Sequence, residues 1–479
     1  MTNWRWWLCS LLFVATTVNY LDRQVLSLTY KEFIAPEFGW TDNDYGTITG
    51  FFSIFYAVAC LFAGKFVDWM GTKKGYLIAI FVWSLGAVMH AGCGWATAHL
   101  VDGVSSVEAM RAVEAGSDIA LAISTTSVYL FLLCRGILAL GEAGNFPAAI
   151  KTTAEYFPKK DRAFATSIFN AGASVGALAA PLCIPPLAKH FGWEWAFIII
   201  GGLGFIWMFF WQFMYDKPEK SKHVNETELA YIQQDEAAEA EADAKPDTGE
   251  EKSIPFIRCF KYRQTWAFIF GKFFTDGVWW FFLFWAPAFF QDQFNAPASS
   301  GLGQALIFTL YAIVTGVSIF GGYLPRIFVD KKGMHPYNGR MLAMLIFAFF
   351  PLVALAAQPL GLHFNSPWWP AILIGIAGAA HQAWSANIFS TVGDMFPKST
   401  VASITGIGAM AGGIGSFIIN KGSGALFTYA EKAGDAFSFL GFTGKPAGYF
   451  IVFCFCGIAY LLAWTIMKTL VPKYSPIKA

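Results

Sequence analysis

Runs of about 20 mostly apolar residues recur along the whole chain, and this pattern constrains the fold more than any other feature of the sequence. A helix of about 20 apolar residues is long enough to cross the hydrocarbon core of a membrane. The runs are Trp6–Leu28, Tyr45–Val67, Gly75–Trp95, Ile123–Ile150, Ala163–Leu187, Trp195–Met214, Trp266–Phe290, Gly303–Leu324, Met341–Ala357, Trp368–Phe396, Val401–Phe427 and Tyr449–Leu470. Only 14% of the 479 residues are charged, which is far below the share in soluble domains. The sequence therefore predicts an all-α integral membrane protein with twelve transmembrane helices.

Positive charge is distributed unevenly among the loops between these runs. Clusters follow runs two, four, eight and twelve, and they comprise Lys65, Lys73, Lys74, Lys159, Lys160, Arg162, Arg326, Lys331, Lys332, Arg340, Lys468, Lys473 and Lys478. Because loops rich in Lys and Arg stay in the cytoplasm, we expect both termini and the loop after run six to be cytoplasmic. The first run is too long for a signal peptide and is predicted to remain as helix one. The net charge of +1 gives no reason to expect a nucleic-acid partner.

The eight cysteines and seven histidines are scattered, and neither set has the spacing of a metal site or a disulfide framework. No nucleophile or paired polar motif stands at a predicted interface. We therefore expect no metal, no cofactor and no enzymatic activity.

Two short signatures occur twice. The segment "FVDWMG" after run two returns as "FVDKKG" after run eight, and "YFPKK" after run four returns as "MFPKS" after run ten. Such repetition is typical of transporters built from two related halves. The sequence predicts an N-terminal six-helix bundle at 1–214, a cytoplasmic linker at 215–263 that is acidic over 235–251, and a C-terminal six-helix bundle at 264–479.

Few charged residues stand inside predicted spans, and the strongest candidates for a function are Asp22 and Arg23 in run one, and Arg135 and Glu142 in run four. Each costs about 2.5–3.5 kcal/mol at the bilayer centre, so they should face a polar cavity or one another. Arg135 and Glu142 are seven residues apart and share one helix face. Structural ion pairs between the two helices, or an Arg23 that extends to the interface, are the alternatives. Polar neighbours such as Asn19 favour a hydrated site.

Several longer segments then point to a family. They are "NYLDRQVL" at 19–26, "GKFVDWMGTKK" at 64–74, "RGILALGEAGNFPAAIK" at 135–151, "YFPKKDRAFATSIFNAGASVG" at 156–176, "WWFFLFWAP" at 279–287 and "AHQAWSANIFSTVGDMFP" at 380–397. Together they resemble the anion:cation symporter family of the major facilitator superfamily, and especially its bacterial hexuronate transporters. The resemblance implies the major facilitator fold and proton-coupled import of a sugar acid, such as glucuronate or galacturonate, across the bacterial inner membrane. We expect a monomer whose partners are this anion, protons and the lipid bilayer.

The resemblance also implies roles for individual residues in the first half. Arg23 and Arg135 match arginines that contact the substrate carboxylate, and a planar guanidinium suits that task. Asp22 and Glu142 match the proton-coupling carboxylates. Cavity-lining positions of the family correspond to Tyr20, Tyr56 and Asn170.

In the second half, polar groups gather within the apolar run ten, and Trp280 of run seven could stack on a sugar ring. The polar residues are His381, Gln382, Ser385 and Asn387. His381 could relay protons or simply be a hydrogen-bonded packing residue. Lys272 and Asp276 could form a structural pair or part of a gate. Some relatives carry an asparagine on helix eleven, where "GIGAMAGG" at 406–413 offers only small residues.

The loop after run two, with Asp68, Lys73 and Lys74, resembles the cytoplasmic gate motif of the superfamily, and Asp330 stands at the equivalent place in the second half. Positive charge there also retains the topology. Three other functions stay open at this point. They are symport of another organic anion such as galactonate, facilitated diffusion without protons, and a transporter-like nutrient sensor.

Overall fold

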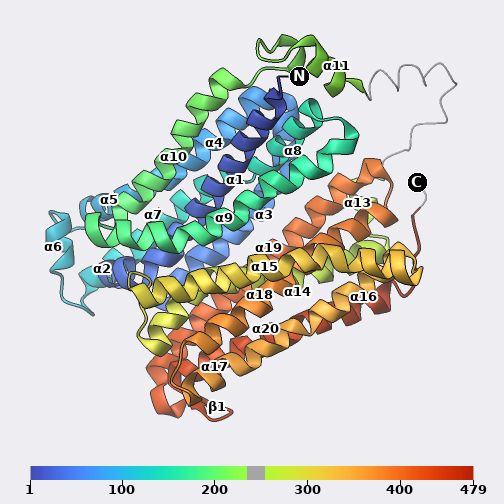
Figure 1. The fold of residues 1–479 in the computed structure, drawn as a ribbon. Coiled ribbons are helices and arrows are strands. Elements are labelled where there is room, and N and C mark those ends of the chain that lie inside the picture. Colours follow the sequence, from blue (N-terminus) through green and yellow to red (C-terminus); the bar gives the residue numbers. More distant parts are fainter. Residues whose placement is uncertain (1, 235–253, 478–479) are drawn as a thin grey trace.

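The computed structural model of the protein describes residues 2–234 and 254–477, and these residues are almost entirely helical (Figure 1). The acidic stretch predicted as a linker, 235–251, lies outside the described residues. Each of the twelve predicted runs coincides, to within a few residues, with one helix or with consecutive helices. Among the described residues, nine helical segments are long and apolar enough to cross a membrane. The prediction of an all-α membrane fold is confirmed.

The long helices fall into two sets of six spans, with the linker between them. The N-terminal set, called the N-half, contains α1 (Trp4–Thr29), α3 (Asp42–Met70), α4 (Thr72–Met89) with α5 (Cys93–Leu100), α7 (Asp118–Glu142) with α8 (Asn145–Tyr156), α9 (Lys159–Phe191) and α10 (Trp193–Met214). The C-terminal set, called the C-half, contains α14 (Arg263–Phe294), α15 (Gly301–Lys332), α16 (Pro336–Ala348) with α17 (Ala354–His363), α18 (Trp368–Met395), α19 (Lys398–Ala433) and α20 (Gly444–Leu470).

Short elements connect these helices. They are the π-helix η1 (Tyr30–Ile34), α2 (Ala35–Phe38), η2 (His90–Gly92), α6 (Val107–Arg111), η3 (Pro218–Lys220), α11 (Glu226–Ile232), α13 (Phe256–Cys259), η4 (Phe350–Val353), η5 (Gly434–Ala436), and the antiparallel strands β1 (Ser438–Phe439) and β2 (Phe442–Thr443). Figure 1 shows both chain termini at one end of the molecule, here called the termini end. The opposite end, with α2, α6, α17 and β1, is called the far end.

The fourth predicted run is not one continuous helix, because α7 ends at Glu142 and α8 begins at Asn145. Close packing against α4 accompanies this break, since a Cβ at Gly141 would lie 2.2 Å from the backbone nitrogen of Trp83. Pro147 stands in the first turn of α8, where a helix needs no N–H donor. The break therefore leaves Glu142 as the last residue of α7, directed into the N-half core.

At the far end the two halves are packed against each other along α3 and α19. A Cβ at Gly46 would lie 2.6 Å from the carbonyl oxygen of Asn420 and 3.0 Å from Gly424 Cα, so the two backbones are nearly in contact. The Lys421 ammonium of α19 donates to Asn43 Oδ1 at 2.8 Å across the same interface. Glycines permit such close helix approach because they lack side chains.

Four charged residues close the far end beside this contact, and we call them the far-end tetrad: Lys31, Asp42, Asp292 and Lys445. Lys31 lies 3.1 Å from Asp42 and 3.2 Å from Asp292. Lys445 lies 2.5 Å from Asp42 and 2.8 Å from Asp292. Since Lys31 and Asp42 belong to the N-half and the others to the C-half, two of these four contacts cross between the halves.

At the termini end, the ion pairs among the side chains that the structure describes join elements of the same half. Lys73 pairs with Asp216 at 2.9 Å and Lys151 with Asp68 at 2.8 Å, all within the N-half and its continuation after α10. In the C-half, Arg340 pairs with Asp394.

The segment after α10 returns to the N-terminus of α1. Glu228 of α11 accepts hydrogen bonds from the Trp4 and Arg5 backbone N–H groups at 3.1 and 3.3 Å, and its carboxylate also pairs with the Arg5 guanidinium at 3.1 Å. Thr2 donates to it as well. Asn3, the N-cap residue of α1, gives no side-chain cap, so a carboxylate from the linker satisfies the free N–H groups of this helix end.

Candidate functional site

The centre of the candidate site is an ion pair between α1 and α7. Arg23 donates from Nε and Nη2 to Glu142 Oε2, at 3.0 and 2.7 Å. Both residues are buried, with exposed fractions of 5% for Arg23 and 1% for Glu142. The second oxygen, Glu142 Oε1, has no hydrogen-bond partner in the described part of the chain. One face of this carboxylate is therefore engaged while the other can accept a proton or a donor.

Aromatic rings surround the Arg23 guanidinium. Its Cζ lies 4.8 Å from the ring centre of Tyr56, 5.1 Å from Trp280 and 5.3 Å from Tyr20. Tyr20 and Tyr56 belong to the N-half, and Trp280 belongs to α14 of the C-half. Arg23 therefore lies where the two halves meet. Cation–π contacts of this kind hold a guanidinium in place without neutralising its charge.

Arg135 is the second buried cation of the site. Its exposed fraction is 2%, its guanidinium lies 5.3 Å from the Phe52 ring centre, and its Nη1 finds no hydrogen-bond partner among the described residues. The charges of Glu142, Asp22 and Arg23 all act on it. A buried guanidinium with a free donor is a strong binding group for a carboxylate.

Asp22 faces away from Arg23 and toward α4. Its Oδ2 accepts from Trp83 Nε1 at 2.7 Å, while its Oδ1 has no hydrogen-bond partner in the ranges that the structure describes. Asn145, at the start of α8, accepts from the Tyr76 hydroxyl at 2.7 Å. Asp22 and Glu142, the two predicted proton carriers, are thus both buried, and each keeps one carboxylate oxygen available.

The remaining predicted substrate-binding residues are dispersed. His381 is buried, has its Nδ1 3.0 Å from the Tyr460 hydroxyl, and stacks on Trp279 with ring centres 5.4 Å apart. Asn387 is also buried and donates to the Ala383 carbonyl of its own helix at 2.8 Å. Gln382 and Ser385 are half-buried, and Asn170 of α9 is exposed. The structure places Trp280, rather than these residues, against Arg23.

The predicted gate residues lie at the termini end. Asp68 pairs with Lys151 and Lys73 with Asp216, while Lys74 and Asp330 are exposed. Both described pairs stay within the N-half and its continuation.

Two features of the molecule were missed at the level of sequence. Trp83 is a tryptophan among many in apolar runs, and nothing in its spacing marks it as the donor to Asp22. The far-end tetrad was missed because its members are separated by long stretches of chain and stand at loop edges, where charges are common.

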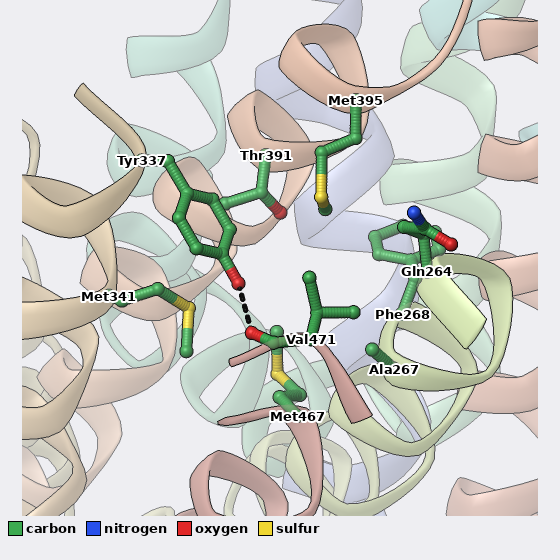
Figure 2. A pocket seen from close by; sticks show the side chains of 9 residues that line it. All are labelled: Gln264, Ala267, Phe268, Tyr337, Met341, Thr391, Met395, Met467 and Val471. Atoms are coloured by element: carbon green, nitrogen blue, oxygen red, sulfur yellow. Dashed lines mark hydrogen bonds between the residues drawn. The ribbon is translucent and has the colours of Figure 1, made fainter. Parts of the chain in front are cut away.

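A small pocket lies elsewhere, between α14, α16, α18 and α20 (Figure 2). Figure 2 shows Tyr337 beside Val471, whose carbonyl oxygen accepts from the tyrosine hydroxyl at 2.7 Å. The free volume of this pocket is about 10 Å³, which is room for a single water molecule. The lining is mainly apolar, so this pocket is a gap in the packing of the C-half.

The fold and the centre between its halves define a class: a multi-pass membrane transporter with buried charges where two six-helix bundles meet. The family model described as Major Facilitator Superfamily matches residues 12–419. The chain belongs to this superfamily, and it is a transporter rather than an enzyme.

Curated relatives cover most of the chain. The hexuronate transporter of Escherichia coli K12 is 29% identical over 423 residues, which are 88% of this chain and 87% of that protein. The galacturonate transporter of Dickeya chrysanthemi is 26% identical and covers 76% of this chain and 92% of its own length. The D-galactonate transporter of Escherichia coli O6:H1 is 25% identical, with 85% and 86% covered.

Solved structures share the fold at low sequence identity. A bacterial homologue of the human lysosomal transporter Spinster aligns with a TM-score of 0.68 at 17% identity, covering 99% of both chains. A D-xylose–proton symporter aligns with a TM-score of 0.64 at 15% identity, covering 98% of this chain and 97% of that one. The predicted major facilitator fold is confirmed.

Proposed function

We propose that the protein is a proton-coupled symporter that imports a sugar acid, a hexuronate such as glucuronate or galacturonate, across the bacterial inner membrane. The observation that carries this proposal is the buried Arg135, whose guanidinium keeps a free donor beside the Arg23–Glu142 pair. The similarity to hexuronate, galacturonate and galactonate transporters supports a sugar acid as the anion.

In the proposed mechanism, substrate and proton bind in support of each other. A substrate carboxylate at Arg135 and Arg23 weakens the hold of Arg23 on Glu142, because both anions then compete for one cation. Glu142, and Asp22 beside Trp83, then take up protons more readily, since a nearby cation had favoured their charged forms. The coupling is reciprocal, so external acid should tighten substrate binding.

The orientation is part of the proposal. Positively charged loops stand at the termini end, and such loops remain in the cytoplasm. With that end inside, the far-end tetrad closes the periplasmic side of a monomer. Transport then requires the halves to part at the far end and to meet at the termini end.

The direct test is uptake of radiolabelled galacturonate into proteoliposomes with an acidic exterior. Arg135→Ala should abolish uptake. Arg135→Lys should retain a part of it, because the positive charge remains while the planar guanidinium that can donate two hydrogen bonds to one carboxylate is lost. Arg111→Ala is the matched control, since Arg111 is an exposed residue of α6 that pairs with Glu37 of α2 at the far end. We call Arg23 and Arg135, the two guanidiniums proposed to bind the substrate carboxylate, the anion clamp. Uptake by Arg135→Ala at the wild-type rate, in protein that elutes as a monodisperse peak, would overturn this assignment.

Coupling needs a separate measurement. Glu142→Gln should lose pH-driven accumulation while it still exchanges internal for external substrate. A pH-sensitive dye inside the vesicles should report acidification on substrate addition with the wild type. Accumulation without that signal would favour facilitated diffusion over symport.

A further inference from the structure

A second buried ion pair lies in the C-half, within one helix. The Lys272 ammonium is 2.8 Å from Asp276 Oδ1, and both residues belong to α14, four positions apart. Their exposed fractions are 6% and 9%. Charged pairs at this depth cost desolvation free energy that their attraction often fails to recover. Because the two partners stand on the same helix, their pairing does not join one helix to another. A purely structural role would therefore do little to offset the desolvation cost.

The pair shares one face of α14 with a residue of the candidate site. Trp280, which contacts Arg23, stands four residues after Asp276 and eight after Lys272, so all three share one face of α14. Asp276 is about 6 Å, one helical turn, from Trp280 along the axis. Across the halves, the charges of Lys272, Arg23 and Glu142 all act on the Cys60 thiol of α3. Lys272 and Asp276 therefore lie on the face of α14 that carries Trp280, the residue through which this helix contacts Arg23.

The small residues of α19 make room for the carboxylate. A Cβ at Gly412 would lie 2.1 Å from Asp276 Oδ2, so this position accommodates Asp276 only as glycine. Gly413, the next residue, packs on α3, where a Cβ would lie 2.3 Å from Ala57 Cβ. The "GIGAMAGG" segment thus brings Asp276 close to the wall of the N-half.

An ammonium and a carboxylate side by side form a donor and an acceptor set for hydroxyl groups. The net charge of the pair is zero, so it suits neutral polar groups rather than a second anion. Adjacent hydroxyls of a sugar can accept from the ammonium with one oxygen and donate to the carboxylate with the other. We propose that Lys272 and Asp276 bind the hydroxyls of the transported sugar acid, and that they make the transporter selective for polyhydroxy acids over simple carboxylic acids. This inference rests on the proposed function and assigns the hydroxyl end of the same substrate.

The test compares two ligands of one shape by calorimetric titration of the purified protein in nanodiscs. Galacturonate carries ring hydroxyls, whereas tetrahydropyran-2-carboxylate has the same type of ring and carboxylate without them. The wild-type protein should bind galacturonate more tightly than tetrahydropyran-2-carboxylate. Lys272→Met and Asp276→Asn should each weaken galacturonate binding at least tenfold and leave binding of the plain acid within about twofold.

Two further variants keep the result interpretable if a single charge left behind disturbs folding. Lys272→Met/Asp276→Leu removes both charges, which buried pairs often tolerate, and it should fold with an unchanged or raised Tm while it loses the preference for galacturonate. Thr275→Ala, at the neighbouring position, removes a hydroxyl that bonds the Gly271 carbonyl, and it should keep the preference.

The outcomes separate the two proposals. If the double variant keeps the full preference for galacturonate, or loses affinity for both ligands equally, the hydroxyl site is overturned while the anion clamp stands. If wild type binds neither acid, or if Arg135→Ala changes the binding of neither, the proposed function is overturned and this inference with it.

Discussion

The two ends of the molecule use charged side chains in opposite ways. At the far end, Lys445 and Lys31 bridge aspartates of both halves within a largely buried cluster, beside glycines that bring α3 and α19 together. At the termini end, pairs such as Lys151–Asp68 are partly exposed and stay within one half. The far end therefore holds the halves together, and the termini end holds each half in shape. In the proposed orientation this is a conformation closed toward the periplasm.

The largest effect is expected from Lys445→Met, which removes one of the two lysines that pair with the buried Asp42 and the half-buried Asp292. Loss of one partner of a buried pair costs about 3–5 kcal/mol, and this cost falls on the closed far end alone. The ratio of molecules with an open far end to molecules with a closed far end should rise at least a hundredfold. Spin labels at Glu114 and Leu440 in a cysteine-free background would report the separation of the halves.

Lys432→Met is the control, because it removes a nearby exposed lysine outside the tetrad. Lys445→Arg, which keeps the positive charge beside Asp42 and Asp292, should keep the short distance. An unchanged distance distribution in Lys445→Met would mean that the tetrad does not hold the halves together.

A smaller effect, measured as a loss of transport, is expected from Gly46→Val. The added side chain would meet the Asn420 carbonyl, because even a Cβ would lie 2.6 Å from it, and the far end could close only with displacement of α19. Uptake should fall several-fold while the purified protein stays folded. Gly64→Val is matched in helix and in chemistry, and nothing lies within 4 Å of its Cβ. Equal uptake by the two variants would contradict the close contact.

At the termini end, Glu228→Gln should lower stability by about 1 kcal/mol, as loss of a helix cap does. Burial alone would raise the pKa of Glu228, but hydrogen bonds from Thr2, Trp4 and Arg5 and the charge of Arg5 outweigh it and lower this pKa. The carboxylate therefore stabilises the fold above the usual glutamate pKa of about 4.3, and its contribution is lost as the pH falls through the lowered value. The Tm difference from wild type should be full at pH 7 and shrink in acid. A constant difference would exclude the charge as the cause.

The smallest effect belongs to Lys151→Ala. Its partner Asp68 is 72% exposed, and surface pairs contribute about 0–1 kcal/mol. We expect a Tm change within that range, reduced further in high salt. A loss as large as that of Lys445→Met would remove the contrast between the two ends.

Much of the fold follows from the sequence, because crossing a membrane imposes a length and an apolar composition that can be read one helix at a time. The charges Arg23 and Glu142 were also found this way, since a charge in an apolar run stands out. The break after Glu142 and the far-end tetrad could not be found, because they depend on contacts between distant residues such as Gly141 with Trp83 and Lys445 with Asp42. Local patterns carry no record of such contacts.

The carboxylate that caps the first helix has a practical consequence for anyone who divides the chain or extends it. The short helix Glu226–Ile232 lies beyond the sixth span, yet its Glu228 accepts hydrogen bonds from the backbone N–H groups of Trp4 and Arg5. Separate expression of the two bundles should therefore place the cut after this helix. Thr2 donates to the same carboxylate, so residues added ahead of it would extend directly from this contact.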